Sequence, residues 1–308
     1  MKLVPVPVSL EESSFDDLLS GLPPAGSGGA LLDARRLRWV DPYGMLGLLA
    51  IGQVASSRGE RYTLQLPVSS EVLSYLARVG FFEQAHDIFD LHGDSRRTWG
   101  GSVSDVLLEI TPVRSHGDVH TVVDRVQERA GLILTKQLNY PRTAVVQFSV
   151  ILSEVCQNIA EHAGAGGWVA AQTYHWAKRL GRKVVVIAVM DLGVGFRASL
   201  AAQHAARHPD PWNDATALQA AFLRGMTRFR DPGRGQGIQQ IRKQVARFAG
   251  KISIRSGTAR IADVPDWDDG SVLSDQLLEF PGAQIGIVLP AIAEGRRVEE
   301  GKRGDSDV

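Results

Sequence analysis

Near the N-terminus, segments with the hydrophobic pattern of a strand alternate with segments whose apolar residues have helical spacing. Residues 29–33 form a short apolar run, and residues 61–66 alternate apolar with polar side chains, so each run predicts a strand. Residues 43–55 and 70–79 carry apolar side chains at helical spacing, the second run behind a serine that suits a helix start. The order is strand, helix, strand, helix, which predicts a small α/β domain over residues 1–86.

The pattern breaks over residues 87–104, a polar stretch with glycines that predicts a connection between two domains. Residues 105–293 then mix strand and helix patterns without strict alternation, and we expect a second domain there. Its predicted strands are 106–110, 168–175, 183–190, 251–256 and 284–289, and its predicted helices are 118–131, 142–162 and 237–248. Residues 294–308 are charged, with almost no apolar side chains, and predict a disordered tail.

Composition narrows the class of protein. Lys plus Arg and Asp plus Glu both number 34, so no global field draws the chain to nucleic acid or to an anionic membrane. The single cysteine, Cys156, excludes an intramolecular disulfide, and we expect it to be a core residue. The N-terminus lacks a signal-peptide pattern, and no apolar stretch approaches the roughly 20 residues of a membrane-spanning helix. We therefore expect a soluble protein of the reducing cytosol.

The helix predicted over Arg142–His162 carries an apolar stripe and, on another face, three polar residues one turn apart. Glu154, Asn158 and His162 stand at i, i+4 and i+8. In such a ridge a carboxamide oxygen can coordinate Mg²⁺, and a carboxylate one turn earlier can take a proton from an attacking water. Taken alone, the same residues are also typical of the solvent-facing side of a helix.

A strand of mostly β-branched residues ends at Asp191, and two glycines, Gly193 and Gly195, follow it. Glycines let the backbone turn tightly and approach a ligand closely. A carboxylate at this position can accept a hydrogen bond from an exocyclic amine, such as that of adenine, while the glycines leave space for the ring. An ordinary Asp/Gly turn is the alternative interpretation.

Three glycines, Gly233, Gly235 and Gly237, lead into the helix predicted over residues 237–248. Amide groups at a helix start bind anions, so this arrangement favours a phosphate cradle. Four arginines lie just before this stretch: Arg224, Arg228, Arg230 and Arg234. Their positive charge would suit a triphosphate, and a solvated face is the alternative interpretation. The chain has no GxxxxGK[ST] sequence, and no strand directly precedes the glycines. A Walker-type P-loop and a dinucleotide-binding βαβ unit are therefore excluded.

Together, the three motifs resemble the nucleotide site of the histidine-kinase-like (GHKL, Bergerat) ATPases. Ser153-Glu-Val-Cys-Gln-Asn-Ile-Ala-Glu-His-Ala163 is similar to their N box, Asp191-Leu-Gly-Val-Gly195 to their G1 box, and Gly233-Arg-Gly-Gln-Gly237 to their G2 box. The resemblance covers residues 105–290. It implies a Bergerat-type α/β sandwich in which a mixed sheet carries helices on one face.

The resemblance also implies roles for single residues. Asn158 would coordinate Mg²⁺, Asp191 would recognise adenine, and Glu154 would be the catalytic base in hydrolysing branches. The other ATP contacts would come from His162, Gly193, Gly195, Arg234, Gly235, Gln236, Gly237 and Ala283, under a mobile lid over residues 197–234. The pair Gly282-Ala283 departs from the family, which usually has Gly-Thr there. One hydroxyl contact near adenine is then missing, and a neutral hydrogen bond contributes about 0.5–1.5 kcal/mol.

The N-terminal segment resembles a STAS domain, the fold of anti-sigma-factor antagonists, in its strand-helix order and in two sequences. Trp39-Val-Asp-Pro-Tyr-Gly-Met-Leu-Gly-Leu-Leu49 is close to their Asp-Ser-Ser/Thr-Gly turn, and Tyr75-Leu-Ala-Arg-Val-Gly-Phe-Phe82 is close to their ending. Pro42 stands where antagonists carry a phosphorylatable serine, so phosphorylation at that position is impossible. The domain would keep an interaction surface without the switch. A generic α/β domain is the alternative.

These features predict a cytosolic regulatory protein that binds ATP or ADP with Mg²⁺. Its nucleotide state would move the lid and change the binding of a protein partner, such as a STAS or sigma-like regulator. It would act as a slow ATPase or as a serine kinase of the anti-sigma-factor kind. The sequence does not fix the oligomeric state, and a homodimer is one possibility. A sensor histidine kinase is disfavoured, because neither a membrane segment nor a phosphoacceptor helix pair precedes the N box.

The alternative is a non-catalytic adaptor that uses a degenerate GHKL fold and the STAS-like module for protein assembly. Ala283 favours this alternative, whereas the presence of Glu154, Asn158 and Asp191 disfavours it. A DNA-processing ATPase would need a basic groove, which the balanced charge does not favour.

Overall fold

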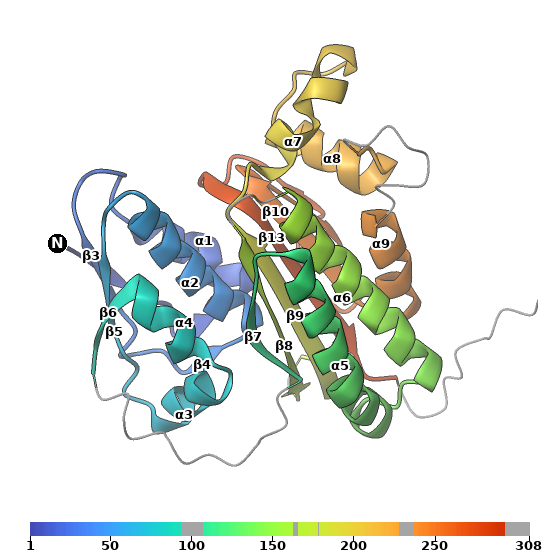
Figure 1. Ribbon diagram of the computed structural model, residues 1–308, viewed down its shortest axis with the longest axis horizontal. Coiled ribbons are helices and arrows are strands. Elements are labelled where there is room, and N and C mark those ends of the chain that lie inside the picture. The colour runs from blue at the N-terminus through green and yellow to red at the C-terminus, as the bar shows by residue number, and fades with distance from the viewer. Residues whose placement is uncertain (94–106, 163–165, 178, 228–236, 293–308) are drawn as a thin grey trace, which may run out of the picture.

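The computed structural model describes residues 1–93, 107–162, 166–177, 179–227 and 237–292 (Figure 1). We call residues 1–93 the N-terminal module and the described residues from 107 to 292 the C-terminal module. The first contains a parallel sheet and the second an antiparallel sheet, and each sheet packs against helices. The protein therefore has a mixed fold of α-helices and β-sheets, as the sequence predicts.

The four main strands of the N-terminal module form a parallel sheet in the order β1-β3-β5-β6. The strands are β1 (Lys2–Pro5), β3 (Ala30–Asp33), β5 (Tyr62–Gln65) and β6 (Phe89–His92), with β2 (Ser9–Leu10) and β4 (Trp39–Val40) as a separate short pair. The helices are α1 (Phe15–Gly21), after the short turn Glu12–Ser14, α2 (Pro42–Ser57), α3 (Ser70–Arg78) and α4 (Phe81–Ile88). The four predicted elements are all present, and β1, α1, α4 and β6 extend them.

The structure moves the predicted boundary of this domain. Helix α4 continues past residue 86, and β6 pairs with β5 in the parallel sheet. The first part of the predicted linker, residues 87–104, therefore belongs to the N-terminal module. Its pattern looked polar because β6 is a short edge strand whose Asp90 and His92 are exposed while Phe89 packs inward. The rest of that linker, from residue 94, and the predicted tail, residues 294–308, lie outside the described residues.

The C-terminal sheet has seven strands in the order β12-β11-β10-β13-β9-β8-β7. They are β7 (Leu108–Val113), β8 (Gly167–Trp176), β9 (Arg182–Asp191), β10 (Lys251–Gly257), β11 (Ala259–Asp263), β12 (Leu273–Ser274) and β13 (Phe280–Pro290). Every pairing between them is antiparallel, so the mixed sheet implied by the family resemblance is wrong. Short hairpin connections, such as the one between β8 and β9, produce antiparallel neighbours.

Helices of the C-terminal module cover one face of this sheet (Figure 1). They are α5 (His116–Gln137), α6 (Arg142–His162) and α9 (Gly237–Arg247), with α7 (Gly195–His204) and α8 (Asp214–Arg224) beyond the end of β9. Helix α6 has the predicted bounds. No helix among the described residues is long and apolar enough to cross a bilayer.

The antiparallel sheet has a hydrophobic core on each face. On β9, Val185, Ile187 and Val189 lie in the core shared with α5, α6 and α9, whereas Ala188 and Met190 lie in a core shared with the N-terminal module. Successive side chains of a strand point to opposite faces, so residues 184–190 of β9 are all apolar because both faces of the strand are covered there. The prediction of helices on one face is therefore incomplete, since the N-terminal module covers the other face.

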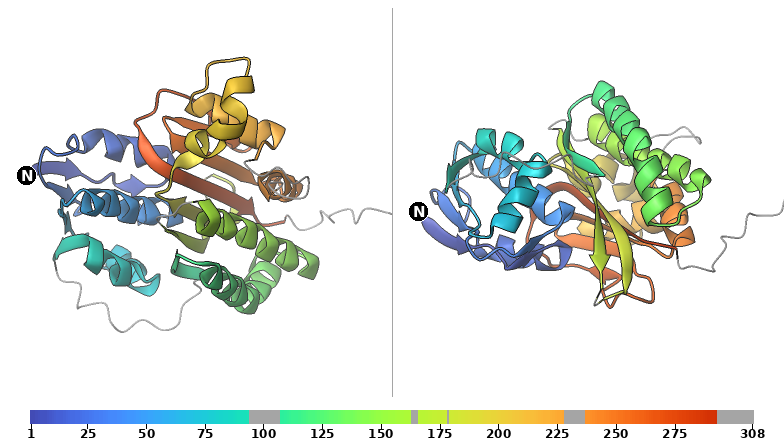
Figure 2. Two further views of the ribbon diagram at one scale, coloured as in Figure 1. Left: turned by 45° about the horizontal axis from the view of Figure 1, so that its top comes forward. Right: turned by 90° about the horizontal axis from the view of Figure 1, so that it is seen from below.

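Helix α2 lies between the two sheets (Figures 1 and 2). Its start is defined by Asp41, whose carboxylate accepts a hydrogen bond from the Gly44 backbone N–H at 2.8 Å, and by Pro42 in the first turn. Apolar residues occur on all sides of α2, as expected of a helix that is buried all round. Gly47 allows close packing, because a Cβ there would lie 2.6 Å from the Phe15 ring.

Hydrogen bonds also join the two modules. The backbone N–H of Ile110 donates to the carbonyl oxygen of Val79 at 2.9 Å, and the hydroxyls of Tyr75 and Tyr174 lie 2.6 Å apart. With the shared core, these contacts make the two modules one packed body.

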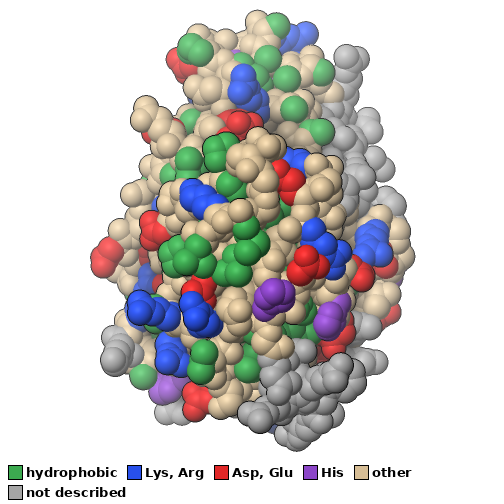
Figure 3. Space-filling view, turned by 90° about the vertical axis from the view of Figure 1, so that its left-hand side faces the viewer, with side chains coloured by type: hydrophobic (Ala, Val, Ile, Leu, Met, Phe, Trp, Pro, Cys, Tyr) green, Lys and Arg blue, Asp and Glu red, His purple; other side chains and the backbone are tan. Residues whose placement is uncertain are grey.

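The outer face of the N-terminal module mixes apolar and charged side chains (Figure 3). Leu3 on β1 is 62% exposed. Nearby charges pair with each other, Arg35 with Asp33 and Arg61 with Asp90, each at 2.7 Å. This face consequently presents no field of a single sign.

Candidate functional site

Asp191 ends β9 on the same face of the sheet as Ile187 and Val189, which is the helix-covered face. Its Oδ1 accepts hydrogen bonds from the backbone N–H groups of Gly193 at 2.8 Å and Ala283 at 3.3 Å. Among the described residues, no donor binds its Oδ2. Burial raises the pKa of this carboxyl to about 6, against the two amide hydrogen bonds, which lower it. Asp191 is thus a fixed carboxyl group with one oxygen that has no donor among the described residues.

Two glycines allow neighbouring backbone segments to pack closely around Asp191. Gly282 has φ +77°, and a Cβ there would collide with the carbonyl oxygen of Asp191. Gly195 has φ +69°, and a Cβ there would lie 2.6 Å from the hydroxyl of Ser256. Both positions favour glycine on two independent grounds, namely the positive φ and the lack of space.

Ser256 is a site residue that sequence reasoning missed. It lies on β10 directly opposite Ala283 of β13. Strand β13 also pairs with β9, the strand that ends at Asp191. Its hydroxyl donates to the carbonyl oxygen of Gly282 at 2.7 Å and accepts from the backbone N–H of Phe196 at 3.1 Å. Ser256 therefore joins the turn after β9 to the start of β13. A single serine inside a predicted strand carries no sequence signal for this role, because its partners are distant in the chain.

Glu154 lies on α6 beside the first residue of α9. A Cβ at Gly237 would be 2.5 Å from Oε2 of Glu154, so only glycine fits against this carboxylate without movement. The last turns of α6 also approach Asp191, because Ile159 contacts Gly167, which is opposite Asp191 in the β8–β9 pairing. The structure thus brings the helix of the predicted N box, the turn of the G1 box and the last glycine of the G2 box to one end of the sheet.

Several predicted site residues can be placed only in part. Asn158 and His162 lie on α6, one and two turns after Glu154, but their side chains are outside the described part of the structure. Gly233, together with the predicted ATP contacts Arg234, Gly235 and Gln236, lies outside the described residues altogether.

The structure describes the predicted lid, residues 197–234, as far as residue 227. These residues include most of α7, which begins at Gly195, and all of α8. The start of α8 is tied to the sheet because the Asp214 carboxylate accepts from both the backbone N–H and the hydroxyl of Thr258, at 3.0 and 2.9 Å. The turn that enters α8 is held as well, since the Trp212 indole donates to the Arg197 carbonyl oxygen at 3.1 Å. Despite its polar composition, this part of the predicted lid forms helices whose ends are held by side-chain hydrogen bonds.

No group of three or more His, Cys, Asp or Glu residues that could hold a metal ion occurs in the described part of the chain. Cys156 is fully buried in the core under α6, and burial raises the pKa of its thiol to about 12. Cys156 is therefore a core residue, as predicted from its place on the helix.

No protein-family model matches the sequence, and no curated protein matches it. Among solved structures, a mycobacterial sensor histidine kinase, MprB, is similar over 59% of this chain and 97% of its own, at 16% sequence identity and a TM-score of 0.27. The functional assignment consequently rests on the geometry of the site.

Proposed function

We propose that this protein binds ATP with Mg²⁺ on the helix-covered face of the antiparallel sheet, and that its nucleotide state regulates a protein interaction. The observation that carries the proposal is the Asp191 carboxyl group. Two backbone amides hold one of its oxygens, no donor among the described residues binds the other, and Gly195 and Gly282 let the surrounding backbone pack tightly against the turn that carries it. The exocyclic amine of adenine is a donor that suits this free oxygen.

The triphosphate would extend from Asp191 toward the start of α9. Gly237 is the first residue of that helix, and amide groups at a helix N-terminus bind phosphate. Glu154 lies beside it, so two negative groups would meet there, and a Mg²⁺ ion held by Asn158 and the phosphates would offset their repulsion. The remaining contacts in this proposal come from His162, Arg234, Gly235 and Gln236.

Two activities are compatible with this arrangement. In a slow ATPase, Glu154 would take a proton from the attacking water. In a serine kinase, the γ-phosphate would instead pass to a hydroxyl of a protein partner. The N-terminal module does not supply that hydroxyl at the position where STAS antagonists do, because this chain has Pro42 there and the residue is buried at the start of α2. In our proposal the STAS-like module serves as an interaction and support module.

A non-catalytic adaptor is the second candidate, and Ala283 favours it. The residue opposite Asp191 on β13 contributes only a methyl group, and the hydroxyl of the adjacent Ser256 already binds two backbone groups. Adenine would therefore lose one contact, which weakens binding by roughly fivefold for a neutral hydrogen bond of about 1 kcal/mol.

Calorimetric titration of the protein with ATP and ADP in the presence of Mg²⁺, followed by an assay for released phosphate, tests the proposal. The variants are Glu154→Ala, Asn158→Ala and Asp191→Asn, with the exposed Asp17→Asn as a matched control. We expect wild type and Asp17→Asn to bind Mg²⁺-ATP equally. Asn158→Ala should weaken the Mg²⁺-dependent part of binding, and Asp191→Asn should weaken binding at least tenfold.

The outcomes separate the candidates. Wild-type protein that binds no nucleotide contradicts the proposal and favours the adaptor. If wild type releases phosphate and Glu154→Ala slows the release by roughly a hundredfold or more, the ATPase activity is supported. Binding without phosphate release, unaffected by Glu154→Ala, supports a switch or a kinase.

A further inference from the structure

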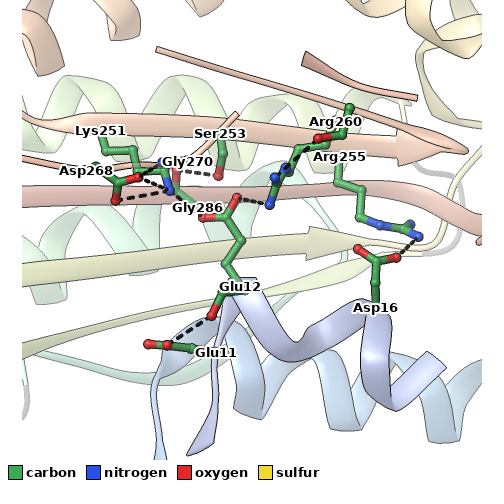
Figure 4. Close-up of polar contacts among 12 residues, drawn as sticks. Glu11, Glu12, Asp16, Lys251, Ser253, Arg255, Arg260, Asp268, Gly270 and Gly286 are labelled. Carbon is green, nitrogen blue, oxygen red and sulfur yellow. Dashed lines mark hydrogen bonds and ion pairs between the residues drawn. The ribbon is translucent and has the colours of Figure 1, made fainter. Parts of the chain in front are cut away.

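Acidic residues of the N-terminal module meet basic residues of the antiparallel sheet at the boundary between the modules (Figure 4). Glu12 pairs with Lys251 at 3.6 Å and with Arg260 at 3.5 Å. Asp16, on α1, pairs with Arg255 at 2.9 Å. The charges are complementary across the boundary, so they favour one orientation of the N-terminal module on the sheet.

Arg255 is the most deeply buried of these cations, with 1% of its side chain exposed against 14% for Lys251 and 20% for Arg260. Its guanidinium lies 5.8 Å from the ring centroids of both Phe15 and Phe280. In the described part of the chain, Asp16 is the one carboxylate that forms an ion pair with it. Removing the partner of a buried charge is strongly unfavourable, so Arg255 depends on Asp16.

The same guanidinium organises the chain that leads into β13. It donates to the carbonyl oxygens of Gly257, at 3.3 Å, and Leu278, and to Oε1 of Gln284 at 3.4 Å. The Gln284 amide in turn donates to the Pro281 carbonyl oxygen at 2.8 Å. Arg255 thus holds both ends of residues 278–284, the segment that contains the glycine and alanine beside Asp191.

Arg255 and its neighbour Ser256 act on opposite faces of β10. Arg255 points to the module boundary, and Ser256 points to the site, where it binds Gly282 and Phe196. A displacement of this part of β10 therefore moves Gly282, which is in van der Waals contact with the Asp191 backbone.

We propose that Asp16 and Arg255 are positioning residues for the nucleotide site, so that docking of the N-terminal module sets the affinity for nucleotide. This inference rests on the proposed function. Without the Asp16 carboxylate, the buried guanidinium keeps only neutral acceptors, so it has to move toward water or toward another carboxylate. Either movement releases residues 278–284 and changes the position of Gly282 and Ala283 relative to Asp191.

The test compares Asp16→Asn with Asp17→Asn, an exposed aspartate one residue further along the same helix. Two quantities are measured on the full-length chain: Mg²⁺-ATP affinity by calorimetry, and backbone hydrogen exchange of residues 191–196 and 278–284 without nucleotide. For Asp16→Asn we expect at least fivefold weaker binding and faster exchange in both segments. Asp17→Asn should match wild type, and Asp16→Glu should restore most of the affinity.

The exchange experiment needs no nucleotide, so it separates failure of this inference from failure of the proposed function. If wild type binds no nucleotide but Asp16→Asn speeds exchange in both segments, the proposed function fails while the structural coupling holds. If wild type binds nucleotide and Asp16→Asn changes neither affinity nor exchange, the inference is overturned.

Two further variants test the role of Arg255 independently, in case Asp16→Asn folds poorly. Arg255→Lys keeps the charge and the pairing with Asp16 but loses the guanidinium fork, so we expect weaker nucleotide binding with the modules still docked. Glu12→Gln weakens the docking contacts to Lys251 and Arg260 but leaves the pair of Asp16 with Arg255 and the bonds of Arg255 to residues 278–284 in place, so we expect a smaller loss of affinity than in Asp16→Asn. Unchanged binding in Arg255→Lys, or an equal loss in Glu12→Gln, overturns the role assigned to Arg255.

Discussion

Asp191 is a buried carboxyl group whose desolvation is offset only in part by its two backbone hydrogen bonds. Its carboxyl group is buried enough to raise the pKa to about 6, although two backbone amides stabilise the charged form. At neutral pH the group is ionised, so the folded protein carries the cost of a partly desolvated charge. A donor from a ligand would offset that cost. Strained or costly groups of this kind cluster at functional sites.

The variant Asp191→Asn should therefore be more stable than wild type at pH 8, by up to about 3 kcal/mol, although we expect it to bind nucleotide poorly. The wild-type pKa is raised in the folded state, so the folded protein binds more protons than the unfolded chain between about pH 4 and pH 6. Wild-type stability falls as pH rises through that window, and the penalty is fully present above it. Chemical denaturation of both proteins from pH 3.5 to pH 8 measures the difference.

The difference should close at low pH, where Asp191 is protonated and resembles asparagine. Asp17→Asn serves as the control for a charge change at an exposed position. A wild type that is more stable than Asp191→Asn at pH 8 would contradict the assignment of a destabilising buried charge.

Gly282→Ala combines a positive φ with a collision, whereas Gly59→Ala provides the positive φ alone. Both glycines have φ near +76°, but a Cβ at Gly59 meets nothing within 4 Å. We expect Gly59→Ala to lower the free energy of unfolding by about 1 kcal/mol. Gly282→Ala should lower it further and abolish nucleotide binding, because the Asp191 carbonyl has to move. Denaturation and calorimetric titration compare the two, and an equal effect of both would show that the close approach is unimportant.

At the scale of elements, the sequence predicted those with a regular local apolar pattern, including the four-residue strands β3 and β5, and missed helices α7 and α8 in a polar segment. Helix α6 and strands β8 and β9 match the predicted segments within one residue at each end, because α6 has a regular apolar stripe and β9 has an unbroken apolar run over residues 184–190. Strands β11 and β12 were missed, since they are short and depend on pairing with distant strands. Helix α2 was predicted, but its burial on all sides was not, because the two sheets that cover it are formed by other segments of the chain.

Gly47 on α2 provides a test of this burial. In an exposed helix, a change from glycine to alanine stabilises by about 1 kcal/mol. At Gly47 the added Cβ would lie 2.6 Å from the Phe15 ring, so we expect Gly47→Ala instead to lower the free energy of unfolding by about 1–3 kcal/mol. Ser56→Ala, at an exposed position of the same helix, should stay within about 0.5 kcal/mol of wild type. Equilibrium denaturation measures both, and a stabilised Gly47→Ala would contradict the packing of α2 against Phe15.

At the scale of the whole molecule, the two modules share one hydrophobic core. Trp168, Met190 and Phe280 of the antiparallel sheet lie in the same cluster as the core of the N-terminal module. Separating the modules would expose this face of the sheet to water, and the ion pairs of Asp16 and Glu12 would be lost with it. The N-terminal module is therefore a structural part of the sheet that bears the site.

The full chain should consequently unfold in one cooperative transition. Differential scanning calorimetry should give one peak whose calorimetric and van't Hoff enthalpies agree. Asp16→Asn should shift that single peak to lower temperature, because it weakens the boundary. Two resolved peaks in wild type would mean that each module is stable alone, which contradicts a shared core.

The sequence by itself determined the α/β class, helix α6, strands β8 and β9, and the candidate residues Glu154, Asp191, Gly195 and Gly237, because these depend on local spacing and on residue chemistry. It did not determine the antiparallel order of the C-terminal sheet, the second covered face, or the roles of Ser256 and Arg255. These depend on which strands become neighbours. Ser256 meets Gly282, and Arg255 meets Asp16, only through contacts between segments far apart in the chain, and no local pattern encodes such contacts.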